Sequence, residues 1–193
     1  MGQRSQIYVR INGELVVANY YQWNYAERMV SRARAIVEWI GEFRKNDWLS
    51  FFEKNGISIN KTYITKLRRI CDINFDMRDV AISSDIFKEY EELGNESTFK
   101  DYVFLEQDNN DGKLFVDITK DHIRYCFTDY NCKKTMGGEK YMAWERGKDW
   151  KKTNRYFTEK DLKICLSNIK FLKSHAKLMT KNEKEEFINK KYQ

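Results

Sequence analysis

Proline is absent from the 193 residues, although an average usage of about 5% would give roughly ten. Its absence excludes proline-rich linkers and cis-proline turns. Long apolar runs are also absent: none approaches the roughly 20 residues that a membrane-spanning helix needs. The first ten residues, MGQRSQIYVR, contain no apolar segment of the kind found in signal peptides. We therefore expect a soluble, cytoplasmic protein that does not contact membranes.

Residues that bind metals or act as nucleophiles are scarce. The chain has four cysteines, none in a CxxC pair, and two histidines, His122 and His175. A zinc site needs closely paired ligands, so we expect reduced, buried thiols, no metal and no cofactor. The segment 137–140 (GGEK) is too short for a nucleotide-binding phosphate loop, which argues against ATPases, GTPases and kinases. We assign no catalytic residue.

Hydrophobic residues make up 41% of the chain and aromatic residues 15%, which is typical of a folded domain rather than a disordered tail. Residues 5–11 and 15–21 are rich in β-branched and aromatic residues. They flank Asn12-Gly13, a strong signal for a β-hairpin. Apolar residues then recur in steps of three and four from Ala26 to Phe43, and they predict an amphipathic helix that Asn24 could cap.

The remaining elements are predicted from similar local patterns. We expect helices over 61–73 and 85–93, a hairpin with strands 98–107 and 113–119, a strand over 122–128, a strand over 141–144, and helices that start after Thr158 and Thr180.

The predicted fold class is α+β. It comprises an N-terminal β-hairpin and long amphipathic helix, a helical middle, a small antiparallel sheet and a C-terminal helix. We expect an α+β core domain over 1–150 and a basic C-terminal helical region, 151–193, packed on it. The apolar stripes of the two longest helices should pack on the sheet, although one of them could instead form a homodimer.

Charge is unevenly distributed. The net charge is +6, but residues 72–121 carry 14 acidic and 5 basic side chains, whereas residues 151–193 carry 5 acidic and 12 basic ones. One interpretation is that the acidic segment covers a basic one within the monomer. The other is that the protein has two faces of opposite sign, one of which contacts a partner.

The basic face would bind RNA or DNA. Its candidate residues are arginines and lysines from two predicted helices and from the segment before the C-terminal helix: Arg28, Arg32, Arg34, Lys66, Arg68, Arg69, Lys151, Lys152 and Arg155. The last three precede a lysine-rich helix, and aromatic residues near the first three could stack on bases.

The acidic face would instead bind a protein, because closely spaced carboxylates can imitate phosphates. Its candidate contacts are Asp108, Asp111 and Asp117, with the aromatic residues Tyr20, Tyr21 and Trp23.

A third hypothesis is a metal-dependent nuclease that uses Asp117, Asp121 and His122. Two carboxylates four residues apart share one face of a strand and could hold a metal ion. Residues 108–112 (DNNDG) resemble part of a calcium loop, but Gln107 and Ile118 occupy positions where that motif needs acids, so we expect a plain loop.

The sequences GQRSQIYVR at 2–10 and YYQWNYAERM at 20–29 resemble small accessory proteins of phages and prophages from low-GC Gram-positive bacteria. The abundance of Ile, Asn, Lys, Tyr and Phe, which have AT-rich codons, fits such a source. The resemblance implies no catalytic residue. It implies a phage-type protein that counters host defence, as anti-CRISPR proteins do.

The sequence therefore predicts a non-catalytic protein that binds and inhibits a host defence nuclease complex, with a CRISPR effector protein or ribonucleoprotein as the first candidate partner. The alternatives are a nucleic-acid-binding accessory protein and, less favoured, the metal-dependent nuclease.

Overall fold

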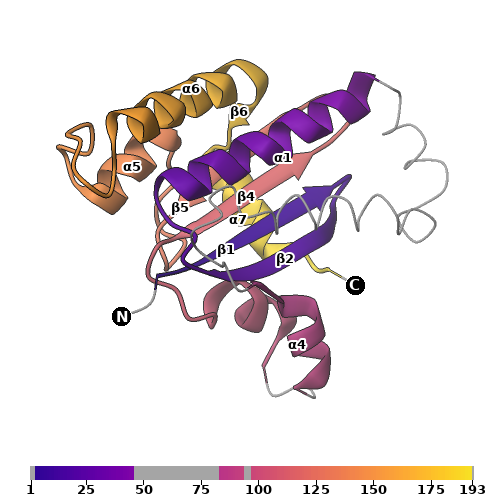
Figure 1. Ribbon diagram of the computed structural model, residues 1–193. Helices are drawn as coiled ribbons and strands as arrows, with labels where there is room; N and C mark the ends of the chain where they lie inside the picture. The colour runs from indigo at the N-terminus through magenta and orange to yellow at the C-terminus, as the bar shows by residue number, and fades with distance from the viewer. Residues whose placement is uncertain (1–2, 46–82, 94–96, 193) are drawn as a thin grey trace.

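A six-stranded mixed sheet forms the centre of the molecule, and the computed structural model describes residues 3–45, 83–93 and 97–192 (Figure 1). The strands are β1 (Arg4–Ile11), β2 (Glu14–Gln22), β3 (Ser83–Asp85), β4 (Lys113–Ile118), β5 (Ile123–Thr128) and β6 (Lys177–Leu178). Their order is β3-β2-β1-β4-β5-β6. The central pair β1 and β4 is parallel, as is the pair β5 and β6, and the remaining pairs are antiparallel.

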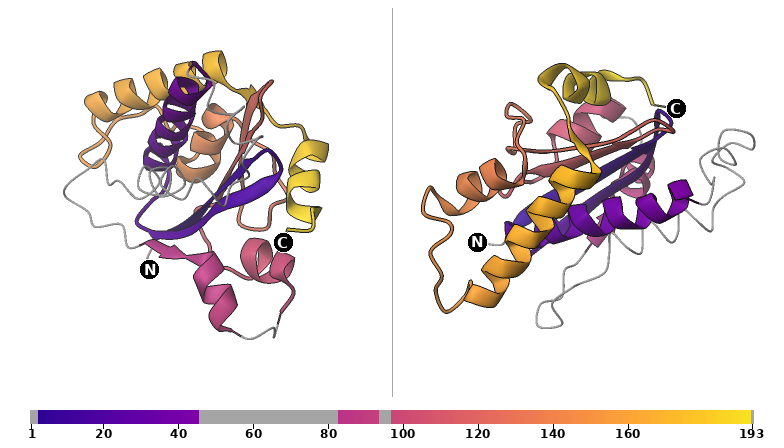
Figure 2. Two further views of the ribbon diagram at one scale, coloured as in Figure 1. Left: turned by 90° about the vertical axis from the view of Figure 1, so that its right-hand side faces the viewer. Right: turned by 90° about the horizontal axis from the view of Figure 1, so that it is seen from above.

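Helices cover both faces of the sheet (Figure 2). They are α1 (Glu27–Lys45), α4 (Ile86–Glu92), the π-helical turn η2 (Asp101–Leu105), α5 (Gly138–Arg146), α6 (Glu159–His175) and α7 (Lys181–Asn189). One core cluster packs α1, α5 and α6 against one face of the sheet. A second cluster packs η2 and α7 against the opposite face. Residues 151–193 thus contribute to both layers. No helix in the described residues is long and apolar enough to cross a membrane.

The N-terminal hairpin and the first helix are confirmed. Asn12 and Gly13 both have positive φ, 49° and 86°, as the tight turn between twisted strands requires. The predicted stripe of α1 is buried from Ala26 to Ile40, and the side chain of Phe43 lies outside the described residues. The predicted cap is wrong. The side chain of Asn24 binds Ser5 Oγ, Met29 Sδ and Arg32 Nε, so it connects β1 to α1 and does not cap the helix.

The helices after β3 and Thr158 are also as predicted. Asp85 caps α4 through the backbone N–H of Phe87, and capping boxes at Thr158 and Thr180 begin α6 and α7. The predicted helix over 61–73 lies outside the described residues.

Two predicted strands are wrong. Residues 101–105 form η2, whose Val103 and Phe104 cover the sheet, because Thr98 and Asp101 bond to each other as a helix start. Residues 141–144 lie in α5, where Tyr141 and Met142 face the core. The sheet is therefore not a small antiparallel one: β4 has no hairpin partner before it and pairs in parallel with β1.

Candidate nucleic-acid interface

Three arginines of α1, at positions 28, 32 and 34, form hydrogen bonds within the protein. Arg32 is 3% exposed, donates from Nε to Asn24 Oδ1 at 2.7 Å, and lies 4.6 Å above the Tyr21 ring. Arg34 donates to Asn168 Oδ1 on α6 at 3.0 Å. The guanidinium of Arg28 donates to the Trp23 carbonyl oxygen at 2.8 Å. We predicted from the sequence that all three bind nucleic acid. In the structure they instead contact β2, the turn that follows it, and α6.

The aromatic candidates Tyr20 and Tyr21 point to opposite faces of the sheet, because successive side chains of β2 alternate between the two faces. Tyr21 is fully buried in the core, Tyr20 is half-buried on the opposite face, and Trp23 is 45% exposed just beyond the strand. Only Trp23 of these three presents a large part of its ring to solvent. Lys66, Arg68 and Arg69 lie outside the described residues.

The three candidate aspartates do not form an acidic surface. Asp108 is exposed and pairs with Arg4, whereas Asp111 and Asp117 are 4% and 5% exposed. A partner could contact only the first of them in this conformation. The prediction that these three carboxylates together imitate phosphates is therefore wrong, because Asp111 and Asp117 are buried.

The side chains of Asp111 and Glu145 of α5 are hydrogen-bonded to each other. The Asp111 carboxylate also accepts a hydrogen bond from the backbone N–H of Arg4. Burial, and then the hydrogen bond to Asp111, raise the pKa of Glu145 to about 8. The two carboxyl groups therefore share a proton at neutral pH.

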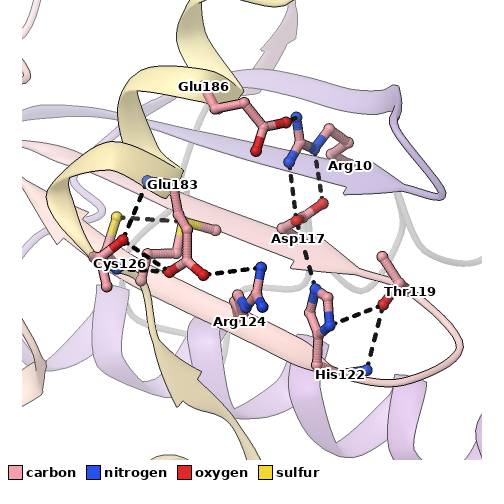
Figure 3. A network of polar contacts seen from close by, with 10 residues as sticks. Arg10, Asp117, Thr119, His122, Arg124, Cys126, Glu183 and Glu186 are labelled. Carbon is pink, nitrogen blue, oxygen red and sulfur yellow. Dashed lines mark hydrogen bonds and ion pairs between the residues drawn. The ribbon is translucent and has the colours of Figure 1, made fainter.

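Asp117 lies in a polar network between β1, β4 and α7 (Figure 3). Arg10 donates to both of its oxygens, from Nε at 2.7 Å and from Nη2 at 2.9 Å. The same guanidinium lies 3.3 Å from the Glu186 carboxylate and 4.6 Å from the Phe187 ring centroid, both on α7. This fork geometry uses both carboxylate oxygens of Asp117 and ties α7 to the centre of the sheet.

His122 completes one side of this network. Its Nδ1 lies 3.1 Å from Thr119 Oγ1 across the β4–β5 turn, and its Nε2 lies 4.0 Å from Asp117 Oδ2 (Figure 3). Nε2 has no hydrogen-bond partner among the described residues. Burial, assisted by the Arg124 guanidinium, lowers the pKa of His122, which favours the neutral imidazole.

The metal hypothesis for Asp117, Asp121 and His122 loses its geometric basis. The strand β4 ends at Ile118, so Asp121 lies in the exposed turn and does not share a strand face with buried Asp117. The Asp117 carboxylate is already bound by Arg10 on both oxygens. Among the residues with described positions, no group of three side chains could hold a metal ion.

Two buried lysines escaped the sequence analysis. Lys113 is fully buried and donates to the Phe104 carbonyl oxygen; burial lowers its pKa. Lys184 is 1% exposed and donates to the Cys132 and Lys134 carbonyl oxygens. The burial of Lys113 could have been predicted, because it lies two residues before Phe115 in the strand and therefore points to the same face of the sheet. The amino groups of both lysines bind backbone carbonyl oxygens inside the protein and therefore contribute no charge to its surface.

The remaining basic candidates are exposed. Lys151, Lys152 and Arg155 project from the α5–α6 connection, residues 147–158, while Trp150 and Phe157 of the same connection are 6% and 1% exposed. The lysine-rich helix predicted beyond them is α6. Its residues Lys160, Lys163 and Lys170 are exposed, and their spacing places them on one side of the helix. We call this set the basic surface: Lys151, Lys152, Arg155, Lys160, Lys163 and Lys170.

Few carboxylates oppose the basic surface. Residues 147–178 carry 9 basic and 3 acidic side chains. Of the basic surface, Lys152 pairs with Asp149 at 2.9 Å, and the other five cations have no ion pair with any described residue. Asp161 is engaged in the capping box of α6. The surface therefore presents cations whose charge is not neutralised within the described chain.

Protein-family models, curated proteins and solved structures give no match to this chain.

Proposed function

We propose that the protein is a non-catalytic nucleic-acid-binding protein that uses the basic surface. The observation that carries this proposal is the set of exposed cations on the α5–α6 connection and α6, five of which form no ion pair with any residue that the structure describes. Phosphate groups are the natural ligands of such a cluster, because each contact releases a condensed counterion.

Other charged residues that the sequence offered for binding are engaged inside the protein, which supports this assignment. The side chains of Arg28, Arg32, Arg34, Lys113 and Lys184 are committed to internal hydrogen bonds. The buried aspartates are likewise committed. Of the basic residues that the sequence analysis proposed and the structure describes, Lys151, Lys152 and Arg155 are the exposed ones, and they lie just before α6.

A charge-reversal variant tests the proposal. Lys151→Glu, Lys152→Glu and Arg155→Glu together should abolish binding of fluorescein-labelled oligonucleotides at low salt, as measured by fluorescence anisotropy. These side chains are exposed, so the fold should tolerate the change. Binding that is unchanged in this variant would refute the assignment of the surface.

A matched control changes the net charge equally at other exposed lysines. The control positions are Lys88→Glu, Lys133→Glu and Lys181→Glu. We expect this control to retain most of the affinity. An equal loss in both variants would mean that only net charge matters and that no localised surface exists.

A second, more specific proposal is that the nucleic acid belongs to a host defence nuclease complex that the protein inhibits. The resemblance of residues 2–10 and 20–29 to phage accessory proteins favours it. Affinity capture from a Gram-positive lysate, with and without nuclease treatment, tests it. Loss of a captured nuclease complex after nuclease treatment would support binding through the nucleic acid, whereas no capture of any defence component would count against it.

A further inference from the structure

Tyr156 occupies an unusual place for a large aromatic side chain. It is 73% exposed, more than any other large hydrophobic side chain in the described part of the chain. It lies with Arg155 at the centre of a tight turn from Asn154 to Phe157. Small or polar residues such as Gly, Asn, Asp and Ser dominate turns, and an exposed ring contributes little to folding there.

The turn is held in place by its own hydrogen bonds. The backbone N–H of Asn154 donates to the Phe157 carbonyl at 2.8 Å. In return, Asn154 Oδ1 accepts from the backbone N–H groups of Tyr156, at 2.8 Å, and of Phe157, at 3.0 Å. Three bonds within four residues fix the backbone that carries the tyrosine.

The turn is also anchored to the core. Phe157 is 1% exposed, and the Arg146 guanidinium lies 4.6 Å above its ring. Arg146 in turn forms an ion pair with Glu27 at the start of α1, at 2.7 Å. Tyr156 is therefore presented to solvent from a rigid support, which lowers the entropy cost of a contact with a ligand.

One cation contacts the ring, and four exposed lysines lie within seven residues of it in the sequence. The Arg155 guanidinium carbon lies 4.4 Å from the centre of the Tyr156 ring, so it stacks on the ring. Lys151 and Lys152 precede the turn, and Lys160 and Lys163 follow it. An exposed ring within a cluster of phosphate-binding cations is the combination by which proteins bind unpaired bases.

We propose that Tyr156, supported by Arg155, is a base-stacking platform, and that the ligand of the basic surface is single-stranded nucleic acid. This inference rests on the proposed function and specifies its ligand. In a duplex the faces of the bases are already stacked on one another, so the ring has no base to contact. In a single strand every base offers a face, whatever its identity.

The experiment measures the affinity of the full chain for three labelled probes of equal length, about 15 nucleotides: oligo(dT), oligo(rU) and a DNA duplex. We expect the wild type to bind the single strands more tightly than the duplex. Tyr156→Ala should weaken binding of the single strands by about 5- to 150-fold and leave duplex binding nearly unchanged. Tyr156→Phe, which keeps the ring, should bind like the wild type.

Tyr130→Ala serves as a matched control. Tyr130 is 50% exposed and lies in a different turn, outside the basic surface. Its loss should not change affinity.

The outcomes separate the inference from the proposed function. If Tyr156→Ala binds single strands as the wild type does, or if the duplex binds as tightly as the single strands, the platform is refuted while nucleic-acid binding stands. If none of the three probes binds at low salt, the proposed function fails, and the platform fails with it.

Discussion

Removal of the Asp117 carboxylate should destabilise the protein far more than removal of a comparable surface carboxylate. Arg10 and Asp117 face each other across the parallel β1–β4 pair, and the side chains are each 6% exposed. Asp117→Ala would leave a buried guanidinium whose remaining carboxylate partner, Glu186, is 67% exposed and 3.3 Å away. An uncompensated buried charge of this kind costs about 3–5 kcal/mol.

We expect a value near the lower limit, about 3 kcal/mol, because Glu186 and the Phe187 ring still contact the guanidinium. For a chain of this length, such a loss lowers the melting temperature by about 6–12 °C. Urea unfolding followed by circular dichroism measures the free energy of unfolding directly.

Asp108→Ala is the matched control, since it breaks an Arg–Asp pair whose side chains are 37% and 65% exposed. Its cost should stay below about 1 kcal/mol. The double variant Arg10→Met/Asp117→Leu removes both charges and should be more stable than Asp117→Ala alone. Equal stabilities for Asp117→Ala and Asp108→Ala would refute the reasoning.

Two further predictions concern titratable groups. Burial and Asp111 raise the pKa of Glu145 to about 8, so the folded state holds a proton that the unfolded state releases near 4.5. Stability should therefore fall as pH rises from about 4.5 to 8, and Glu145→Gln should flatten this part of the melting-temperature profile; an unchanged slope would contradict the shared proton. Burial raises the pKa of Cys126 well above its usual range and that of Cys165 to about 12, so iodoacetamide should label both thiols only after denaturation, as peptide mass spectrometry can show. Rapid labelling of either thiol in the native protein would contradict its burial.

Local signals in the sequence predicted the elements whose structure is decided locally. Asn12-Gly13 fixes a turn that needs two positive φ angles, and the capping boxes at Thr158 and Thr180 specify where helices begin. These features depend on residues a few positions apart, so no knowledge of the fold is needed to predict them.

The errors arose where a distant contact overrides the local pattern. The strand prediction for 98–107 was wrong because Val103 and Phe104 cover the sheet as a helical turn, in contact with Tyr8 and Phe115. Nothing in the sequence shows that β4 pairs in parallel with β1, more than a hundred residues earlier.

The site residues show the same division. Lys151, Lys152 and Arg155 are exposed, as a binding surface requires. Arg32 and Asp117 are also charged candidates, but their neighbours in the fold bury them. Charge in the sequence cannot distinguish a buried ion pair from a surface patch, since burial depends on contacts that form only in the folded protein.

The central claim is that the exposed cations of the basic surface bind phosphates, and the salt dependence of oligonucleotide binding tests it most directly. If all six contact phosphates of a single strand, the logarithm of the binding constant should fall with the logarithm of salt concentration with a slope of about −4. The variant Lys151→Glu/Lys152→Glu/Arg155→Glu should bind too weakly to titrate, or with a clearly shallower slope. A slope near zero for the wild type, or no binding at low salt, would contradict the account.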